Sequence, residues 1–167
     1  MFKNKTVIAI EGIDGSGKTT QCIRLMDYLK ERGLKGRLVG RRFMFSTIVA
    51  FISGKEVIIA DRYITTIEIY LRHKGFGEKL VNKLLNWLPR PKLLFYMDID
   101  VATAMNRIAL RGRKPDRYES KDGLEIFAKG YDRIFEKNND ALIRLNALDE
   151  SDNLHEQMKE AVSNVLW

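Results

Sequence analysis

The sequence is poor in residues that could cross-link a small fold. Its single cysteine, Cys22, has no partner for an internal disulfide, and neither it nor the two histidines belong to a cluster with metal-site spacing. We therefore expect neither a disulfide nor a structural zinc ion. A reducing, cytoplasmic compartment is the natural setting for such a chain.

Long apolar runs are missing as well. No stretch approaches the ~20 apolar residues that cross a bilayer, and the run at residues 6–10 is too short for a signal-peptide core. We find no internal repeat, linker or low-complexity tract, so residues 1–167 are expected to form one domain with no membrane partner. Hydrophobic residues make up 45% of the chain and charged residues 31%, which is typical of a globular protein.

Short apolar runs typical of buried strands alternate with stretches of helical periodicity. The periodic stretches predict helices from Lys18 to Gly33, around Leu80 to Leu88, over 102–110 and 124–135, and from about Leu154 to Val165. Residues 43–52 are apolar all round, which leaves helix and strand open with a helix favoured. The strands are predicted at 6–10, 36–39, 56–60, 93–97 and 142–148. This alternation predicts an α/β fold of three layers, with a parallel sheet between helices.

A glycine-rich segment follows the first predicted strand and opens the first helix. It has the P-loop pattern of nucleoside-triphosphate-binding proteins, because glycines let backbone N–H groups turn towards phosphate oxygens at a helix N-terminus. Lys18 is expected to contact the β and γ phosphates, and Thr19 to help hold Mg²⁺. A dinucleotide site is excluded because the third glycine of that motif is missing. The predicted ATP-binding residues are Gly12, Ile13, Asp14, Gly15, Ser16, Gly17, Lys18, Thr19 and Thr20.

Three residues, Asp61, Arg62 and Tyr63, directly follow the predicted strand 56–60. Ligands of open α/β sheets bind at such strand ends. Asp61 is a candidate for holding Mg²⁺ through water, and Arg62 for clamping a phosphate with two hydrogen bonds. A surface ion pair at a strand end is the alternative interpretation.

The excess positive charge is concentrated in one segment. The chain has a net charge of +7, and residues 107–121 hold six basic and two acidic residues, a net +4. Arginines alternate there with Gly112 and Pro115, which indicates a lid that brings positive charge to a transferred phosphoryl group. A solvated charged loop is the alternative. Nucleic-acid binding is suggested by the total charge alone, and the local concentration of charge argues against it.

Together these segments resemble the thymidylate kinase family of nucleoside monophosphate kinases. The resemblance covers most of the chain and rests on residues 11–21 (EGIDGSGKTTQ), 61–63 (DRY) and 111–119 (RGRKPDRYE). It implies a five-stranded parallel sheet wrapped by helices, Mg·ATP as phosphoryl donor, dTMP as acceptor and a homodimer.

The resemblance also implies roles for individual residues. Asp14 matches the carboxylate near the acceptor sugar, Arg62 the arginine on the acceptor phosphate, and Tyr70 a tyrosine near the acceptor nucleoside. Tyr63 and Thr66 complete the implied substrate-binding set. Gly15 stands where another branch of the family has an arginine, so the catalytic arginines are expected from the lid. The implied catalytic residues are Lys18, Arg62, Arg111, Arg113 and Arg117, and the implied metal-binding residues are Thr19 and Asp61.

The chain departs from the family pattern in two places. Only 42 residues separate Lys18 from Asp61, where the family usually has a longer segment with a helix that closes over the acceptor. Leu71 replaces a glutamine whose amide reads the base. The predicted function is phosphorylation of dTMP to dTDP in nucleotide biosynthesis. The alternatives are a kinase with another or broader acceptor, such as dUMP, UMP or CMP, and a nucleotide-binding relative without transferase activity.

Overall fold

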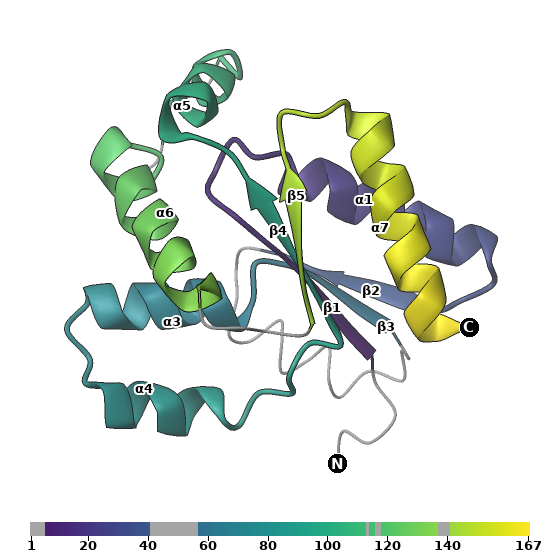
Figure 1. Cartoon of the computed structure of the whole chain (residues 1–167), viewed down its shortest axis with the longest axis horizontal. Coiled ribbons are helices and arrows are strands. Elements are labelled where there is room, and N and C mark those ends of the chain that lie inside the picture. Colours follow the sequence, from purple (N-terminus) through teal and green to yellow (C-terminus); the bar gives the residue numbers. More distant parts are fainter. Residues whose placement is uncertain (1–5, 41–56, 113, 116–117, 137–140) are drawn as a thin grey trace.

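A five-stranded sheet forms the centre of the computed structural model, which describes residues 6–40, 57–112, 114–115, 118–136 and 141–167. The strand order is β2-β3-β1-β4-β5, and every neighbouring pair is parallel (Figure 1). The predicted α/β fold with a central five-stranded parallel sheet is confirmed. The strands are β1 (Thr6–Glu11), β2 (Gly36–Val39), β3 (Val57–Asp61), β4 (Leu93–Asp98) and β5 (Leu142–Asn146).

Helices cover both faces of the sheet. On one face α1 (Lys18–Glu31) packs beside α7 (Ser151–Leu166), and on the other α3 (Ile64–His73) packs against α4 (Glu78–Leu85) and α6 (Lys121–Phe135) (Figure 1). The short helix α5 (Val101–Ala109) lies next to α6. Within the described part of the chain, no helix has both the length and the apolar character needed to span a bilayer.

The central strand β1 is buried on both sides. Its apolar residues Val7 to Ile10 are at most 1% exposed, and a continuous run of this kind is what a parallel sheet between two helical layers requires. In the sheet register Ile10 lies opposite Asp61 of β3, and Glu11 lies opposite Tyr96 of β4. The carboxyl ends of the three central strands therefore meet at one edge.

The five predicted strands, and the predicted helices that fall within the described residues, are present with ends shifted by a few residues. The last strand stops at Asn146 rather than at residue 148, and the helix expected from Leu80 to Leu88 is α4, Glu78–Leu85. The helix favoured for 43–52 lies outside the described residues. The periodicity did not predict α3, whose N-cap residue is Tyr63 and which has no side-chain cap of its own.

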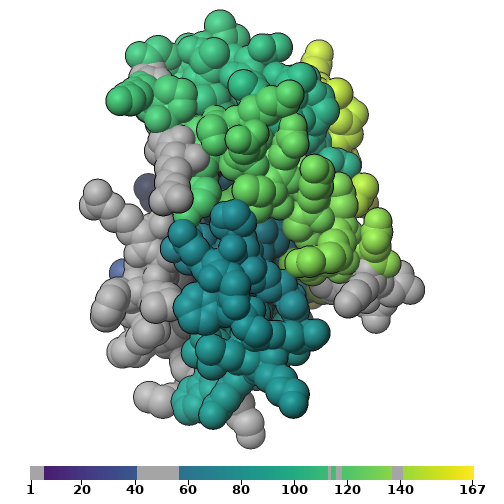
Figure 2. All heavy atoms as spheres, turned by 90° about the vertical axis from the view of Figure 1, so that its left-hand side faces the viewer, coloured from purple at the N-terminus to yellow at the C-terminus, as the bar shows by residue number. Residues whose placement is uncertain are grey.

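Helix α6 is in close contact with α3 at Gly130. On the face shown in Figure 2, α6 (green) lies directly against α3 (teal). A Cβ atom at Gly130 would lie 2.7 Å from Cγ2 and 2.8 Å from Cγ1 of Ile69. Ile69 is 3% exposed, and its β-branched side chain has few rotamers into which it could move away. The contact therefore requires glycine.

We expect Gly130→Ala to lower the free energy of unfolding by about 1 kcal/mol or more, because overpacking exceeds the gain in helix propensity. Urea denaturation measures the change. Gly40→Ala is the control, since Gly40 lies outside the helices, does not have a positive φ and has open space at its Cβ position. That variant should change stability by less than about 0.5 kcal/mol. Equal stability of the two variants would contradict the close α3–α6 contact.

Candidate functional site

The loop between β1 and α1 is enclosed by other parts of the chain. Gly12 and Gly15 have φ angles of +143° and +90°, and Cβ atoms there would lie 2.7 Å from the Met97 carbonyl oxygen and 2.6 Å from that of Ala104. Only glycine fits both this backbone conformation and this space. The loop is thus held against the end of β4 and against α5.

Helix α1 begins directly after this loop with an open N-terminus. Its N-cap residue is Gly17, which has no side chain to cap the first turn, and that turn contains no acidic residue. The free N–H groups and the positive end of the helix dipole are suited to binding phosphate. Lys18 bends back into the same loop, where Nζ donates to the Ile13 carbonyl at 2.6 Å and to Ser16 Oγ at 3.4 Å.

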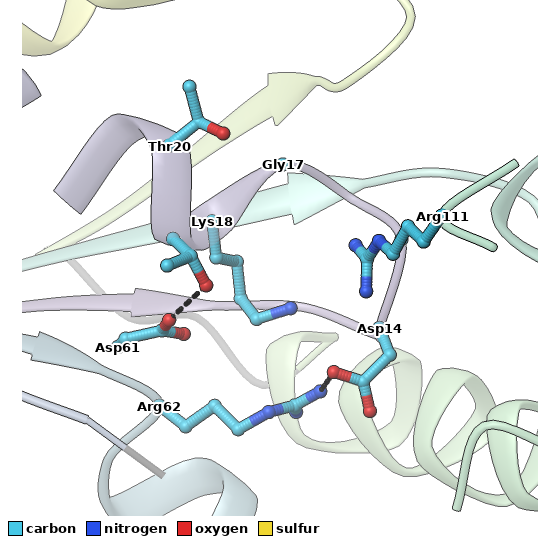
Figure 3. Close-up of a pocket in the computed structure, with 9 residues that line it drawn as sticks. Asp14, Gly17, Lys18, Thr20, Asp61, Arg62 and Arg111 are labelled. Carbon is cyan, nitrogen blue, oxygen red and sulfur yellow. Dashed lines mark hydrogen bonds and ion pairs between the residues drawn. The ribbon is translucent and has the colours of Figure 1, made fainter. Parts of the chain in front are cut away.

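A cavity opens beside the loop, at the carboxyl ends of β1 and β3. Figure 3 shows Lys18, Arg62 and Arg111 pointing towards it from α1, from the turn after β3 and from the segment after α5. The residues that line it are Asp14, Gly15, Gly17, Lys18, Thr19, Thr20, Asp61, Arg62 and Arg111. Three predicted catalytic cations are therefore brought together with most of the predicted ATP-binding residues.

The other predicted residues of the loop and of the lid are not among the described residues that line the cavity. Gly12, Ile13 and Ser16 belong to the loop but do not line the cavity. Arg113 and Arg117 fall outside the described residues. Arg111 lies 3.5 Å from Glu119, whose side chain is fully buried, so an ion pair links residues 111 and 119 within the segment 107–121.

Thr19 and Asp61, two oxygen-bearing residues that line the cavity, are hydrogen-bonded to each other. Thr19 Oγ1 donates a hydrogen bond to Asp61 Oδ2 at 2.5 Å. In the described part of the chain no three His, Cys, Asp or Glu side chains are grouped as a protein metal cage. Mg²⁺ at phosphoryl-transfer sites takes one or two protein ligands and completes its shell with phosphate and water. A hydroxyl next to a carboxylate, beside a phosphate-binding loop, fits that requirement.

Arg62 is the most constrained cation of the site. Its φ of +75° is the sole positive φ at a non-glycine position among the described residues. Its guanidinium lies 2.9 Å from Asp14 Oδ1, and Nη1 donates to the Tyr131 hydroxyl at 3.1 Å. Burial by itself would lower the pKa of Arg62, but Tyr131, Asp14 and Glu11 raise it above its ordinary value. The guanidinium therefore stays charged although it is buried.

The pKa of Lys18 is shifted downwards, in the opposite direction to that of Arg62. Burial, and then the charge of Arg62, lower the pKa of Lys18 to about 7 against the raising effect of Asp14 and Asp61. Near neutral pH the ligand-free loop thus holds a mixture of ammonium and neutral amine. Phosphate oxygens beside Nζ would favour the charged form and raise this pKa again.

Of the predicted substrate-binding residues, Asp14 and Arg62 line the cavity, whereas Tyr63, Thr66 and Tyr70 do not. Tyr63 is 1% exposed, and its hydroxyl donates to the Pro89 carbonyl at 2.9 Å. The Thr66 hydroxyl donates to Glu11 Oε2 at 2.5 Å. Tyr70 is 39% exposed and stands edge-on to Tyr118. Of these side chains, the one at the surface is Tyr70.

Two buried residues of the site had no predicted role. Glu11 is fully buried and accepts five hydrogen bonds, from Tyr63, Thr65, Thr66 and Tyr131. Burial, and then the charge of Glu11, raise the pKa of Tyr131 above its ordinary value, so its hydroxyl remains a donor. A carboxylate that ends an apolar strand is visible in the sequence, but its partners lie 52 to 120 residues away.

Comparison with known proteins gives a consistent result. The family model described as thymidylate kinase matches residues 10–42 and 38–158, which together are most of the chain. The two matches meet at 38–42, within the stretch between Lys18 and Asp61 that is short for the family.

Curated relatives with this name come from bacteria and archaea. The thymidylate kinase of Xanthomonas campestris pv. campestris (strain B100) is 28% identical over 152 positions, covering 71% of this chain and 67% of the relative. The probable thymidylate kinase of Sulfurisphaera tokodaii is 26% identical over 189 positions, covering 95% and 96%. That of Methanococcus aeolicus is 27% identical over 163 positions, covering 79% and 83%. The alignment of 189 positions is longer than this chain of 167 residues, so this chain lacks residues that the relative has.

The lowered pKa of Lys18 predicts proton uptake when a nucleoside triphosphate binds. At pH 8 most ligand-free Lys18 is neutral and bound Lys18 is charged, so each site should take up close to one proton, about 0.9 at most. Titration calorimetry in two buffers of different ionisation enthalpy measures this uptake.

Lys18→Met, which has a similar length and no charge, is the control and should take up none. Affinity of the wild type should fall as the pH rises above 7, because binding must then recharge the amine. Equal binding heats in both buffers would contradict the lowered pKa.

Proposed function

This chain belongs to the thymidylate kinase family, and we propose that it transfers the γ-phosphoryl group of ATP to dTMP, forming dTDP for nucleotide biosynthesis. The observation that carries the proposal is the convergence of Lys18, Arg62 and Arg111 on one cavity beside the phosphate loop. A donor phosphate on the loop and an acceptor phosphate at Arg62 would then lie on opposite sides of the same space.

The donor side is supported by the loop and by α1. Backbone N–H groups at the helix start and the Lys18 ammonium would neutralise the phosphates of ATP, with Thr20 at the same helix start. Thr19 and Asp61 would hold the Mg²⁺ that accompanies ATP. That ion supplies charge neutralisation for the donor phosphates.

The acceptor side is supported by Arg62 and Asp14. A nucleoside monophosphate is mostly dianionic at neutral pH, because its second pKa is about 6. The acceptor oxygen therefore needs no general base, and positioning with charge neutralisation would carry the reaction. Asp14 lies next to Arg62 and would face the sugar, while the exposed Tyr70 is available to the nucleoside. Of the two residues left, Thr66 is bound to Glu11 and Tyr63 to Pro89, so we give both an indirect role.

The lid would complete the charge around the transferred phosphoryl group. Arg111 already lines the cavity, and the family resemblance adds Arg113 and Arg117 from the same segment, 107–121. Charge that develops on the phosphoryl oxygens is stabilised best by cations that are held in place before the reaction. We propose that the working form is a cytoplasmic homodimer of one-domain subunits that binds neither membranes nor nucleic acid.

A kinase with a different or broader acceptor is the second candidate. Leu71 is partly buried against the core, so no side-chain amide is presented from this position. The short stretch between Lys18 and Asp61 adds to this argument, because family members use a longer segment there to close over the acceptor.

A coupled ADP-release assay tests the proposal. The protein is supplied with Mg·ATP and with dTMP, dUMP, UMP, CMP, dCMP, AMP or GMP in turn. Strong preference for dTMP is the expected result, and Lys18→Ala should abolish it in a protein that remains folded. Activity on several monophosphates would favour the second candidate. Binding of ATP without transfer to any acceptor would refute the kinase proposal in favour of a regulatory nucleotide-binding protein.

Single substitution of the lid arginines separates catalysis from binding. We expect Arg111→Ala, Arg113→Ala or Arg117→Ala to lower kcat by about 100-fold for the residue that contacts the transferred group, with a smaller change in KM for ATP. Steady-state kinetics at saturating acceptor measures this difference. An unchanged kcat in all three variants would remove the lid from the mechanism.

A further inference from the structure

One oxygen of Glu11 caps a helix that belongs to a different part of the chain. Oε1 accepts hydrogen bonds from the backbone N–H groups of Tyr63 at 2.9 Å, Thr65 at 3.1 Å and Thr66 at 3.2 Å. These groups lie at the start of α3, whose N-cap residue provides no side-chain cap. A carboxylate at a helix N-terminus also interacts favourably with the helix dipole. Glu11, the last residue of β1, therefore caps the N-terminus of α3 in place of a residue next to the helix.

The other oxygen of Glu11 is linked to the guanidinium of Arg62 through two hydroxyl groups. Oε2 accepts from Thr66 Oγ1 at 2.5 Å and from the Tyr131 hydroxyl at 3.0 Å. The two hydroxyl oxygens are 2.7 Å apart. Arg62 Nη1 donates to the Tyr131 hydroxyl at 3.1 Å.

Donor and acceptor chemistry gives this chain of bonds one direction. A guanidinium can only donate and a carboxylate can only accept. The Tyr131 hydroxyl therefore accepts from Arg62 and has one hydrogen to donate, either to Glu11 Oε2 at 3.0 Å, to Thr66 Oγ1 at 2.7 Å, or to the more distant Gly12 carbonyl at 3.3 Å. The Thr66 hydroxyl donates to the carboxylate. The orientation of the Arg62 guanidinium is in this way coupled to Glu11 through the Tyr131 hydroxyl.

The backbone of Arg62 is held by the same end of β1. Its N–H donates to the Ile10 carbonyl at 2.9 Å, and the next N–H, that of Tyr63, donates to Glu11. Between these two bonds lies the left-handed conformation of Arg62, with φ +75°. Such a conformation costs free energy at a non-glycine residue and persists where its surroundings impose it. Glu11 thus restrains the backbone turn at Arg62 and, through Tyr131, the side chain of Arg62.

Burial makes a purely stabilising role a poor explanation. Glu11 and Tyr131 are fully buried, and Arg62 is 7% exposed. Taking a carboxylate and a guanidinium out of water is costly, and well-packed apolar residues often stabilise a core as well or better. Networks of this kind that fix one geometry are found where a functional group must be pre-positioned.

We propose that Glu11, acting through Thr66 and Tyr131, is a positioning residue that holds Arg62 in the orientation needed for the acceptor phosphate. This inference rests on the proposed function, because that function makes Arg62 the acceptor-phosphate arginine. It adds three residues that act on the acceptor without touching it.

Tyr131→Phe is the central test. It removes the hydroxyl between Arg62 and Glu11 and keeps the ring, which stacks on Phe135. Because a hydrogen bond to a charged group is lost, KM for the monophosphate should rise about tenfold while KM for ATP stays within about twofold. Side-chain NMR of the Arg62 guanidinium, assigned with Arg62→Lys, should show faster exchange of its N–H protons than in the wild type.

A matched control is available on the opposite face of the sheet. Tyr28 is 7% exposed, and its hydroxyl is 2.7 Å from Ser163 Oγ between α1 and α7. Tyr28→Phe removes a comparable buried hydroxyl contact at a place that touches none of the cavity residues. It should leave both KM values and the Arg62 signal unchanged, so any general effect of losing a tyrosine hydroxyl is separated from the specific one.

Variants at Thr66 and Glu11 test the other links of the network. Thr66→Val should raise KM for the monophosphate, and Thr66→Ser, which restores the hydroxyl, should return it to the wild-type value. In Glu11→Gln the amide oxygen can still accept from the three N–H groups of α3, but the amide nitrogen presents donors to Thr66 and Tyr131. We therefore expect α3 to persist by hydrogen exchange, with KM for the monophosphate raised at least as much as in Tyr131→Phe.

The two proposals fail in different ways. A wild type without transfer to any monophosphate refutes the kinase function, and the Arg62 NMR comparison still decides the positioning role. A wild type that is active, with Tyr131→Phe and Thr66→Val matching it in acceptor KM and in Arg62 exchange, refutes the positioning role and leaves the kinase function standing. Equal rises in both KM values, or no rescue by Thr66→Ser, would show a merely structural network and would also overturn the inference.

Discussion

The common edge at which β1, β3 and β4 end is the constraint on which the site depends. Parallel pairing sets Ile10 opposite Asp61 and Glu11 opposite Tyr96, so residues far apart in the chain lie close together in the fold. The phosphate loop leaves this edge from β1 and is held against β4 and α5, where the carbonyl oxygens of Met97 and Ala104 leave no room for a Cβ atom at the two loop glycines. The loop conformation is therefore a consequence of sheet register and close packing.

The electrostatics of the cavity follow from the same arrangement. Lys18 and Arg62 are both buried, and burial together with the charge of Arg62 lowers the pKa of Lys18. Asp14 and Asp61 offset this effect for Lys18, which still has a lowered pKa of about 7. Arg62 keeps its charge because a carboxylate and a hydroxyl contact it directly. The positive charge of Lys18 is thus incompletely compensated by the surrounding protein groups. Phosphate oxygens bound at the loop would complete this compensation.

Local patterns predicted the parts of the structure that local sequence controls. The glycine loop, α1 and the central strands are recognisable because spacing and apolar runs are properties of neighbouring residues. Helix α3 was not predicted, since its cap is supplied by Glu11 from another strand and not by a residue before the helix. The importance of Tyr131 was hidden for the same reason, because its hydroxyl partners lie in two distant segments, residues 11–12 and residues 62–66. The sequence shows where a carboxylate or a tyrosine stands in the chain, whereas strand register and packing determine which residues it contacts.

The same reasoning separates recognition of the acceptor phosphate from recognition of its base. Arg62 and Asp14 follow the ends of central strands, and their positions depend on the pairing of β1 with β3. The connection from β2 to β3 comprises only residues 40–56, close to the minimum of about a dozen residues that a parallel crossover needs. The pairing of β2 with β3 is intact despite this short connection. We therefore expect its length to affect discrimination between bases more than the proposed binding of the acceptor phosphate.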